Sequence, residues 1–340
     1  MKRLLMLILL VAVVAGLCAL EMKKRFETEL SVPQEGYTLN VVAGDSLRSV
    51  SAQLVADGVF EFPYVLRAYG RWTGLDQSIK RGEYLLKPGL TPVTLLALLQ
   101  SGRVVSYAVT LPEGITLSKA IAILADTDVL AAELTGADDP RIAQLIAPLE
   151  LPEGLFLPET YRFERGDSDW QVLQRAYAEL QKVLAQEWQE RAPELPYETP
   201  YEALIMASII ERETGVPSER PEIAGVFVRR LQKRMRLQTD PTVIYGLGEA
   251  FDGNLRRKHL ADAGNPYNSY RHHGLPPSPI ALAGRAAINA ALHPAAGTTL
   301  FFVAKGDGSH QFSTTLEEHE RAVRKYQLKR RQDYRSTPEK

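Results

Sequence analysis

The N-terminal apolar segment constrains this chain more than any other stretch. Residues Leu4 to Leu20 form a run of 17 residues without a charge, with Lys2-Arg3 before it and Glu21 and Lys23-Lys24-Arg25 after it. This length reaches the lower end of the range for a membrane-spanning helix, about 17–25 residues. We therefore expect a single-pass anchor over residues 4–20. The alternative is a cleaved signal peptide, whose apolar core is usually shorter, about 7–15 residues.

The composition of the chain is that of a globular protein. With 340 residues, 45% of them apolar and 24% charged, it is long enough for about two domains. Lys plus Arg (40) nearly balance Asp plus Glu (41), so no overall field attracts nucleic acid, and none is expected as a partner. The basic patches Arg256-Arg257-Lys258 and Arg321 to Arg331 are expected to be solvated faces. The single cysteine, Cys18, excludes an intramolecular disulfide framework and a cysteine-based zinc site.

The segment from Leu39 to Gly102, which follows a polar spacer, has the pattern of a small α+β module. A strand at Val41-Val42 leads to a helix capped by Asp45 or Ser46. A second strand, over Glu83 to Leu86, leads to a helix with Thr91 as its cap. Each half of the module is thus expected to be a strand, a turn and a helix.

Part of this module resembles the LysM domain, the small sugar-binding module of cell-wall proteins. The similar positions are Val42, Gly44-Asp45-Ser46-Leu47 and Val50. The resemblance implies that residues 39–102 bind glycan. Because the stretch between Gly58 and Gly82 is longer than a LysM domain usually needs, the alternative is an interaction or spacer domain that binds no sugar.

A second, larger α+β domain is expected over residues 104–335. Its first strand runs up to Leu111, turns at Pro112-Glu113-Gly114, and leads to a helix. Residues 152–163 are expected to form a loop rich in Pro and Gly, and Asp169 to Arg191 a long helix. Near the C-terminus, "KGDGSH" between "LFFVA" and "HQFS" predicts a hairpin turn.

One helix in this domain places a carboxylate on its apolar side. Thr199-Pro200-Tyr201-Glu202 forms a capping box that starts the helix. Leu204, Ala207 or Ser208, and Glu211 then follow at helical spacing along one face. We therefore expect Glu211 to face inward, and Arg212 and Glu213 to face water or a neighbouring element.

An inward-facing glutamate suits proton donation. Burial disfavours the ionised form, so the pKa of Glu211 is expected to rise toward neutrality. Cleavage of a glycosidic bond requires such a neutral carboxylic acid to protonate the leaving oxygen. The alternative is a structural glutamate whose carboxylate is satisfied by a basic neighbour or by backbone amides.

Two polar segments downstream have the composition of a saccharide groove. They are Gln238-Thr239-Asp240-Pro241-Thr242 and the stretch holding Tyr267, Asn268 and Tyr270. Aromatic faces stack on sugar rings, while amides and hydroxyls bind sugar hydroxyls. A metal or nucleotide enzyme is disfavoured, because His272-His273 has no third ligand at metal spacing and no phosphate-loop context occurs. No metal or cofactor is expected.

The series "EGLFLPETY", "ASIIERETG", "RMRLQTDPTVIYG", "PYNSYRHHGLPPSPI" and "LFFVAKGDGSHQFSTTLEEH" resembles the endolytic murein transglycosylase (YceG-like) family, in order, over roughly Val104 to Gln327. The resemblance implies that Glu211, which opens the E-x-E-T motif, is the catalytic acid and base. It also implies that six residues of the two polar segments line the groove: Gln238, Thr239, Asp240, Tyr267, Asn268 and Tyr270. Arg271-His272-His273 departs from the commoner pattern of the family and is assigned no role.

The resemblance also implies a reaction and a location. The enzyme would cut the MurNAc-GlcNAc β-1,4 bond inside peptidoglycan glycan strands, leave 1,6-anhydro-MurNAc ends, and limit the elongation of nascent strands. It would lie in the bacterial cytoplasmic (inner) membrane with its catalytic domain on the periplasmic side, beside peptidoglycan synthases (penicillin-binding proteins). Two alternatives stay open: a lysozyme-type hydrolase that uses Glu211 and Asp240, and a non-enzymatic scaffold that binds the wall or division proteins.

Overall fold

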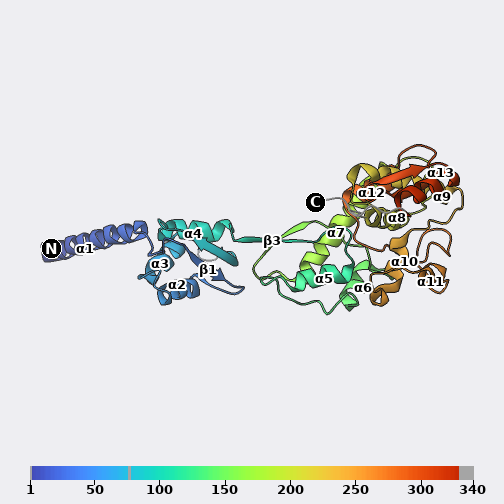
Figure 1. Ribbon diagram of the computed structural model, residues 1–340. Helices are drawn as coiled ribbons and strands as arrows, with labels where there is room; N and C mark the ends of the chain where they lie inside the picture. The colour runs from blue at the N-terminus through green and yellow to red at the C-terminus, as the bar shows by residue number, and fades with distance from the viewer. Residues whose placement is uncertain (1, 76–77, 329–340) are drawn as a thin grey trace. The chain divides into compact units, whose positions relative to one another are not determined.

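The computed structural model describes residues 2–75 and 78–328, which form two compact units, each described separately below (Figure 1). The first unit contains the residues up to Tyr107 together with Arg162–Asp167. The second contains Ala108–Tyr161 and the residues from Ser168 onward. Residues 329–335 of the expected catalytic domain, which include the end of the basic tail, lie outside the described residues.

Helix α1 (Lys2–Glu27) contains the expected anchor. Its most apolar window of 18 residues, within Leu4–Glu27, has a mean hydropathy of 2.8, and none of that window is buried. It is long and apolar enough to cross a membrane, a criterion that an N-terminal signal sequence would also meet. Its last turn packs on other residues of the first unit: the ring centroid of Phe26 lies 5.2 Å from that of Tyr69, and Arg25 Nη1 donates to the Tyr64 hydroxyl at 2.6 Å.

The first unit places three helices against a small sheet. Strand β1 (Tyr37–Val41) pairs antiparallel with β2 (Gly82–Leu86), with Leu39 opposite Tyr84. The helices are α2 (Leu47–Ala56), α3 (Pro63–Thr73) and α4 (Pro92–Ser101). Ser46 caps α2 and Thr91 caps α4, as expected, while Asp45 accepts a hydrogen bond from Val42 N at 2.8 Å. Helix α3 fills the stretch that exceeds the length of a LysM domain.

The second short sheet contains β3 (Ser106–Thr110) and β4 (Thr160–Glu164). The expected loop over residues 152–163 is therefore wrong at its end, where Tyr161 and Phe163 alternate with exposed residues and are buried. Period-two burial is the signature of a strand with one covered face. The Pro and Gly residues that suggest a loop lie before this segment.

The second unit is mainly helical. Its elements are α5 (Leu117–Ala125), α6 (Pro140–Ile146), α7 (Asp169–Gln189), α8 (Pro200–Glu213), the short 3₁₀ helix η2 (Pro217–Glu219), α9 (Arg220–Gln232), α10 (Asp240–Leu247), η3 (Gly248–Ala250), α11 (Arg257–Ala261), α12 (Arg285–Leu292), β5 (Phe301–Ala304), β6 (His310–Ser313) and α13 (Leu316–Tyr326). The expected helix from Asp169 and the expected hairpin are both confirmed, since β5 pairs antiparallel with β6. The basic patch Arg256-Arg257-Lys258 is exposed, as expected.

Helix α8 lies in the core of this unit. All residues from Ala203 to Ile210 are buried, and α8 contacts α7, α9, α10 and α12. Helix α12, which contacts it, buries Ile288 and Leu292 together with the small side chains Ala287, Ala290 and Ala291. Small residues allow the two helix axes to come close, because little side-chain volume separates them.

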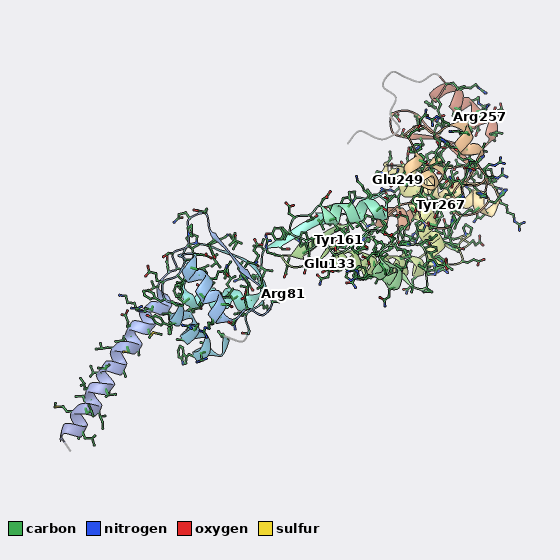
Figure 2. The ribbon with its side chains drawn as sticks, turned by 90° about the horizontal axis from the view of Figure 1, so that it is seen from below. Arg81, Glu133, Tyr161, Glu249, Arg257 and Tyr267 are labelled. Carbon is green, nitrogen blue, oxygen red and sulfur yellow. The ribbon has the colours of Figure 1, made fainter. Side chains whose placement is uncertain are left out.

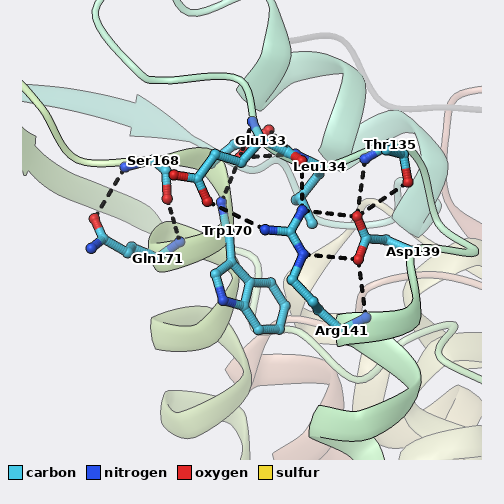
Figure 3. Close-up of polar contacts among 9 residues, drawn as sticks. Glu133, Leu134, Thr135, Asp139, Arg141, Ser168, Trp170 and Gln171 are labelled. Carbon is cyan, nitrogen blue, oxygen red and sulfur yellow. Dashed lines mark hydrogen bonds and ion pairs between the residues drawn. The ribbon is translucent and has the colours of Figure 1, made fainter.

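A polar cluster fixes the loop that precedes α6 to the start of α7 (Figure 3). The Asp169 carboxylate accepts hydrogen bonds from the backbone N–H groups of Glu133, at 2.9 Å, and Leu134, at 3.1 Å. Arg141 donates from Nη2 to Asp139 Oδ2 at 2.9 Å, and the hydrogen bonds from Arg141 hold the pKa of Asp139 well below its usual range. These contacts satisfy backbone groups that would otherwise lack partners in an irregular segment.

Candidate active site

The last turn of α8 carries Glu211. The helix begins at the predicted capping box, where Thr199 Oγ1 accepts from Glu202 N at 3.2 Å and Glu202 Oε2 accepts from Thr199 N at 3.3 Å. The Glu211 side chain is 4% exposed, so its inward orientation is confirmed. The capping box sets where the helix starts, and helical periodicity from there directs this carboxyl group into the core.

Two donors from other helices hold the Glu211 carboxyl. Arg220 Nη2, at the start of α9, donates to Oε1 at 2.9 Å. The backbone N–H of Gly284, the N-cap residue of α12, donates to Oε2 at 3.0 Å. The structural alternative from the sequence, a glutamate satisfied by a basic neighbour or a backbone amide, thus describes the contacts correctly. Donors of this kind also stabilise the carboxylate that remains after an acid has given up its proton.

A second carboxylate shares the same arginine. Arg220 Nη2 donates to Glu113 Oε2 at 3.2 Å, and the Glu113 side chain is 46% exposed. Glu113 lies in the predicted turn after β3. Two contacts fix this turn over the end of α8: Gly114 N donates to Leu282 O at 2.8 Å, and Arg212 Nη1 donates to Gly114 O at 2.9 Å. Glu113 is therefore an acidic group beside Glu211 that extends toward solvent.

The surroundings of Glu211 raise its pKa. Burial is the largest cause, because it penalises the ionised form, and the negative charge of Glu113 raises the pKa further. The positive charge of Arg220 and the hydrogen bonds from Arg220 and Gly284 oppose this shift. The net direction is upward, so Glu211 keeps its proton to a higher pH than an ordinary glutamate. Such a group can donate a proton and afterwards accept one.

The guanidinium of Arg220 has a buried donor that makes no hydrogen bond within the part of the chain that the structure describes. Its Nε is buried and has no hydrogen-bond partner among the described residues, while its Nη2 serves both carboxylates. An unpaired buried donor is costly unless something satisfies it. Arg220 therefore has hydrogen-bonding capacity left within this site.

Glu213 lies two residues further on and points to a different neighbour. Its carboxyl accepts a hydrogen bond from Thr239 Oγ1 at the start of α10, so it contacts a neighbouring element, whereas Arg212 is exposed. Although the residue as a whole is partly exposed, burial of its carboxyl group raises the pKa of Glu213 to about 7, and the nearby Asp240 adds to this rise. Glu213 is a second protonatable group in α8 that the sequence did not single out.

The two polar segments expected to form a groove meet each other. The Tyr270 hydroxyl donates to Asp240 Oδ1 at 2.6 Å, and the Gln238 backbone N–H donates to the carbonyl of Ser269 at 3.2 Å. Gln238 and Asp240 are exposed, and Thr239 is buried. Asp240 acts electrostatically on Glu213, while the acidic neighbour that acts on Glu211 is Glu113.

Tyr267 and Asn268 differ in their surroundings. The Tyr267 hydroxyl lies 2.7 Å from Ser278 Oγ, and its ring packs edge-on to Tyr245 with centroids 4.8 Å apart. Asn268 is fully buried, and its amide donates to the carbonyl of Asp262 at 2.6 Å and of His259 at 3.1 Å. Its position argues against contact with a sugar. We assign Asn268 the role of holding this loop.

The sequence missed three residues of the Glu211 site: Glu113, Arg220 and Gly284. They lie 98, 9 and 73 positions from Glu211 along the chain, and each belongs to a different element. The only local signal was the turn at Pro112-Glu113-Gly114, which predicts a change of direction but no partner. In residues 2–75 and 78–328, no group of three or more His, Cys, Asp or Glu is placed to hold a metal ion.

These features define an α+β protein with an apolar N-terminal helix and a desolvated carboxylic acid at the end of a core helix. The chain belongs to the YceG-like family, whose model matches residues 39–325. It is 30% identical to an endolytic murein transglycosylase of Bacillus subtilis (strain 168), with 85% of this chain and 84% of the relative covered. An endolytic murein transglycosylase of Streptococcus pneumoniae (D39) is 25% identical, and the match covers 84% of this chain and 57% of that protein.

A solved structure agrees with this assignment. The crystal structure of a YceG-like protein from Listeria monocytogenes superimposes with a TM-score of 0.53 and is 31% identical in sequence. The match covers 85% of this chain and 99% of the other. The family assignment made from the ordered motifs is therefore confirmed.

Proposed function

We propose that this protein is an endolytic murein transglycosylase that cleaves the MurNAc-GlcNAc β-1,4 bond of peptidoglycan and leaves 1,6-anhydro-MurNAc ends. Relatives of this name in Bacillus subtilis and Streptococcus pneumoniae match 85% and 84% of the chain. The observation that carries the chemistry is the Glu211 carboxyl, buried on the last turn of α8 and raised in pKa. A carboxyl group that keeps its proton to a higher pH than an ordinary glutamate is the kind of acid that glycosidic cleavage needs.

The proposed reaction needs one carboxyl group. Protonated Glu211 donates its proton to the glycosidic oxygen, which leaves with GlcNAc as the C1–O bond of MurNAc breaks. The Glu211 carboxylate then takes the proton of the C6 hydroxyl of the same MurNAc, and the C6 oxygen bonds to C1. Glu211 ends the cycle protonated and no water is consumed, so the second carboxylate of a hydrolase is not required.

The neighbours of Glu211 suit both halves of this cycle. Burial and the charge of Glu113 raise the pKa of Glu211 and so favour its protonated form, which donates the proton. Arg220 and the Gly284 amide stabilise the carboxylate that exists after donation. Because these effects oppose each other, neither the acid nor the base form is trapped.

The substrate would lie along the two polar segments. We assign the exposed Gln238 and Asp240, together with the partly exposed Tyr267 and Tyr270, to sugar binding, supported by the Tyr270–Asp240 hydrogen bond that joins the segments. Thr239 is buried, and its hydrogen bond to Glu213 holds the first of these segments against α8. Aromatic and polar groups in this combination are typical of saccharide sites.

The membrane location is also part of this proposal. Helix α1 would anchor the protein in the bacterial cytoplasmic membrane, with the second unit on the outer side and peptidoglycan synthases as partners. Its length and hydropathy support an anchor. The N-terminal mass of protein purified from membranes tests this directly, because an intact N-terminus supports the anchor and loss of residues near Leu17-Cys18-Ala19 supports a cleaved signal. The LysM-like glycan binding of residues 39–102 is a proposal that rests on the motif residues alone.

The test of the reaction is mass spectrometry of peptidoglycan digested in H₂¹⁸O by the full chain in a neutral detergent. Anhydro-MurNAc ends without ¹⁸O, which disappear with Glu211→Gln but persist with the control Glu249→Gln, are expected. Glu249 is an exposed acid in the same unit (Figure 2). Reducing ends that carry ¹⁸O would instead support the hydrolase that uses Glu211 and Asp240. Unchanged glycan with every variant, and with the protein in membranes, would support the scaffold.

A further inference from the structure

A hollow lined by arginines lies in the first unit, whereas the candidate active site belongs to the second unit. It has a volume of about 530 Å³ and lies between the start of α2 and one face of α3. The residues that line it are Ser46, Leu47, Arg48, Tyr64, Arg67, Ala68 and Arg71. Tyr64, Arg67, Ala68 and Arg71 follow the i, i+3, i+4, i+7 spacing of a single helix face, so α3 presents them together.

The charge of this hollow is uncompensated. Among the residues that the structure describes, no acidic residue lines it, and no carboxylate lies within ion-pair distance of Arg48, Arg67 or Arg71. The carboxylate of the nearby Asp45 accepts hydrogen bonds from Val42 N and Ser49 Oγ instead. Three guanidinium groups around one hollow repel each other, and an anion between them removes that repulsion. Guanidinium groups bind phosphate oxygens through two parallel hydrogen bonds, which makes a phosphate the best-matched ligand.

The hollow lies beside the end of the apolar helix. The uncharged run ends at Leu20, and five residues of helical rise place Arg25 about 7.5 Å beyond it. The polar headgroup region adds about 5–7.5 Å to each side of the hydrocarbon core. Arg25 Nη1 donates to the hydroxyl of Tyr64, which lines the hollow. If α1 spans the membrane, the hollow therefore lies at the level of the lipid headgroups.

An exposed aromatic residue supports the same placement. Trp72 follows Arg71 on α3 and is 77% exposed, and Tyr64 is 45% exposed. Large aromatic side chains are costly in water but are enriched where a membrane meets it. We propose that the arginine-lined hollow binds the phosphate group of an anionic membrane lipid. The assignment rests on the proposed anchoring by α1 and is independent of the reaction at Glu211.

The test is a titration of the full chain, in a neutral detergent, with short-chain phosphatidylglycerol, followed by microscale thermophoresis. The pocket variant Arg48→Gln/Arg67→Gln/Arg71→Gln is compared with Arg81→Gln/Lys87→Gln/Arg103→Gln, which removes the same charge from exposed positions elsewhere in this unit (Figure 2 labels Arg81). We expect affinity for the lipid to fall about tenfold or more in the pocket variant and to be retained in the control, because each basic residue near an anionic lipid surface contributes separately to binding. Short-chain phosphatidylcholine, which has no net charge, is expected to bind neither protein.

Three results would overturn the proposal. Equal losses in both triple variants would indicate diffuse charge attraction, and no loss in either would place the lipid elsewhere. Inorganic phosphate that binds as tightly as the lipid would assign the hollow to free phosphate. If circular dichroism shows that the triple variant is unfolded, the three single substitutions replace it. Peptidoglycan cleavage by the wild type is measured on the same samples, so failure of the proposed reaction would appear there without affecting the lipid titration.

Discussion

The proton affinity of Glu211 is set by opposed contributions from single residues. Burial and Glu113 raise its pKa, whereas Arg220 and the amide of Gly284 lower it. A carboxyl group held only by the arginine and the amide would be a permanent carboxylate, and one held only by apolar side chains would be a permanent acid. Glu113 is thus the residue whose removal shifts this balance with the least disturbance, because its side chain is partly exposed.

Replacing Glu113 with Gln should change the pH dependence of cleavage. Without the negative charge of Glu113, the pKa of Glu211 falls, so the acid form is lost at a lower pH and the alkaline limb of the rate profile moves toward acid. We expect a loss of about tenfold on that limb and a smaller loss at acid pH. The rate of anhydro-end formation against pH, with Glu249→Gln as the control, measures this. A uniform loss at every pH would instead show that Glu113 only supports the turn.

Gly284 should be as sensitive as Glu113, for a steric reason. A Cβ at Gly284 would lie 1.8 Å from Glu113 Oε1 and 2.4 Å from its Cδ. Its backbone φ of −73° suits any residue, and the far end of Glu113 can move, so Gly284→Ala should cost less than about 1 kcal/mol of stability. It should displace Glu113 and move the alkaline limb as Glu113→Gln does. In the double variant the two shifts should not add, and additive shifts measured in this cycle would contradict the shared mechanism.

At the scale of elements, α8 joins two protonatable sites on opposite sides. Glu211 contacts α9 and α12, and Glu213 contacts the start of α10. Position 213 lies about 200° around the helix from position 211, so the two carboxyl groups point to different elements. Because the Glu213 carboxyl accepts a hydrogen bond from Thr239 at the start of α10, the protonation state of Glu213 affects the contact between α8 and α10, the helix that carries Asp240.

The raised pKa of Glu213 predicts a pH-dependent stability. Its ordinary pKa is 4.5 and its folded pKa is about 7, so the stabilisation that comes from keeping the proton is complete below pH 4.5 and is lost as the pH rises through 7. Across this range we expect a loss on the order of 2–3 kcal/mol in the second unit. Glu213→Gln should flatten the dependence, measured by denaturant unfolding that follows Trp170 and Trp188. A profile unchanged by this substitution would contradict the assignment.

The local signals in the sequence account for the start of α8 but not for its partners. The capping box and the periodicity placed Glu211 inward, because both depend on residues within four positions of each other. Gly284 and Glu113 reach this site from 73 and 98 positions away. Helix α12 is short, and alanines make up three of its five buried residues, so the sequence gives it only a weak apolar periodicity. Contacts between elements that are distant in sequence produce no regular spacing of residues. The sequence therefore predicts the inward-facing Glu211 but not the groups that shift its pKa.

At the scale of the molecule, a short segment from later in the chain packs with the first unit. The sequence suggested a boundary near Val104, but Arg162–Asp167 belongs with the first unit. Arg165 forms an ion pair with Glu83 of β2, and the Tyr107 hydroxyl donates to the same carboxylate at 2.9 Å. The ring of Phe163 stacks on Tyr107 with centroids 5.7 Å apart. Charge pairing across 82 positions could not be predicted from either segment alone.

The ion pair between Arg165 and Glu83 predicts that Arg165 stabilises the sheet of β1 and β2, which is far from it in sequence. In Arg165→Gln the carboxylate of Glu83, only 9% exposed, keeps the Tyr107 hydroxyl but loses its countercharge, which is costly for a buried ion. We expect hydrogen exchange of β1 and β2 amides in the full chain to rise about fivefold, with Arg271→Gln as an exposed control in the second unit. Adding Glu83→Gln should restore much of the protection, because no buried charge then remains. If Arg165→Gln leaves the exchange rates of β1 and β2 unchanged, Arg165 does not stabilise this sheet. If the double variant does not restore protection, the effect comes from packing by the apolar stem of the arginine.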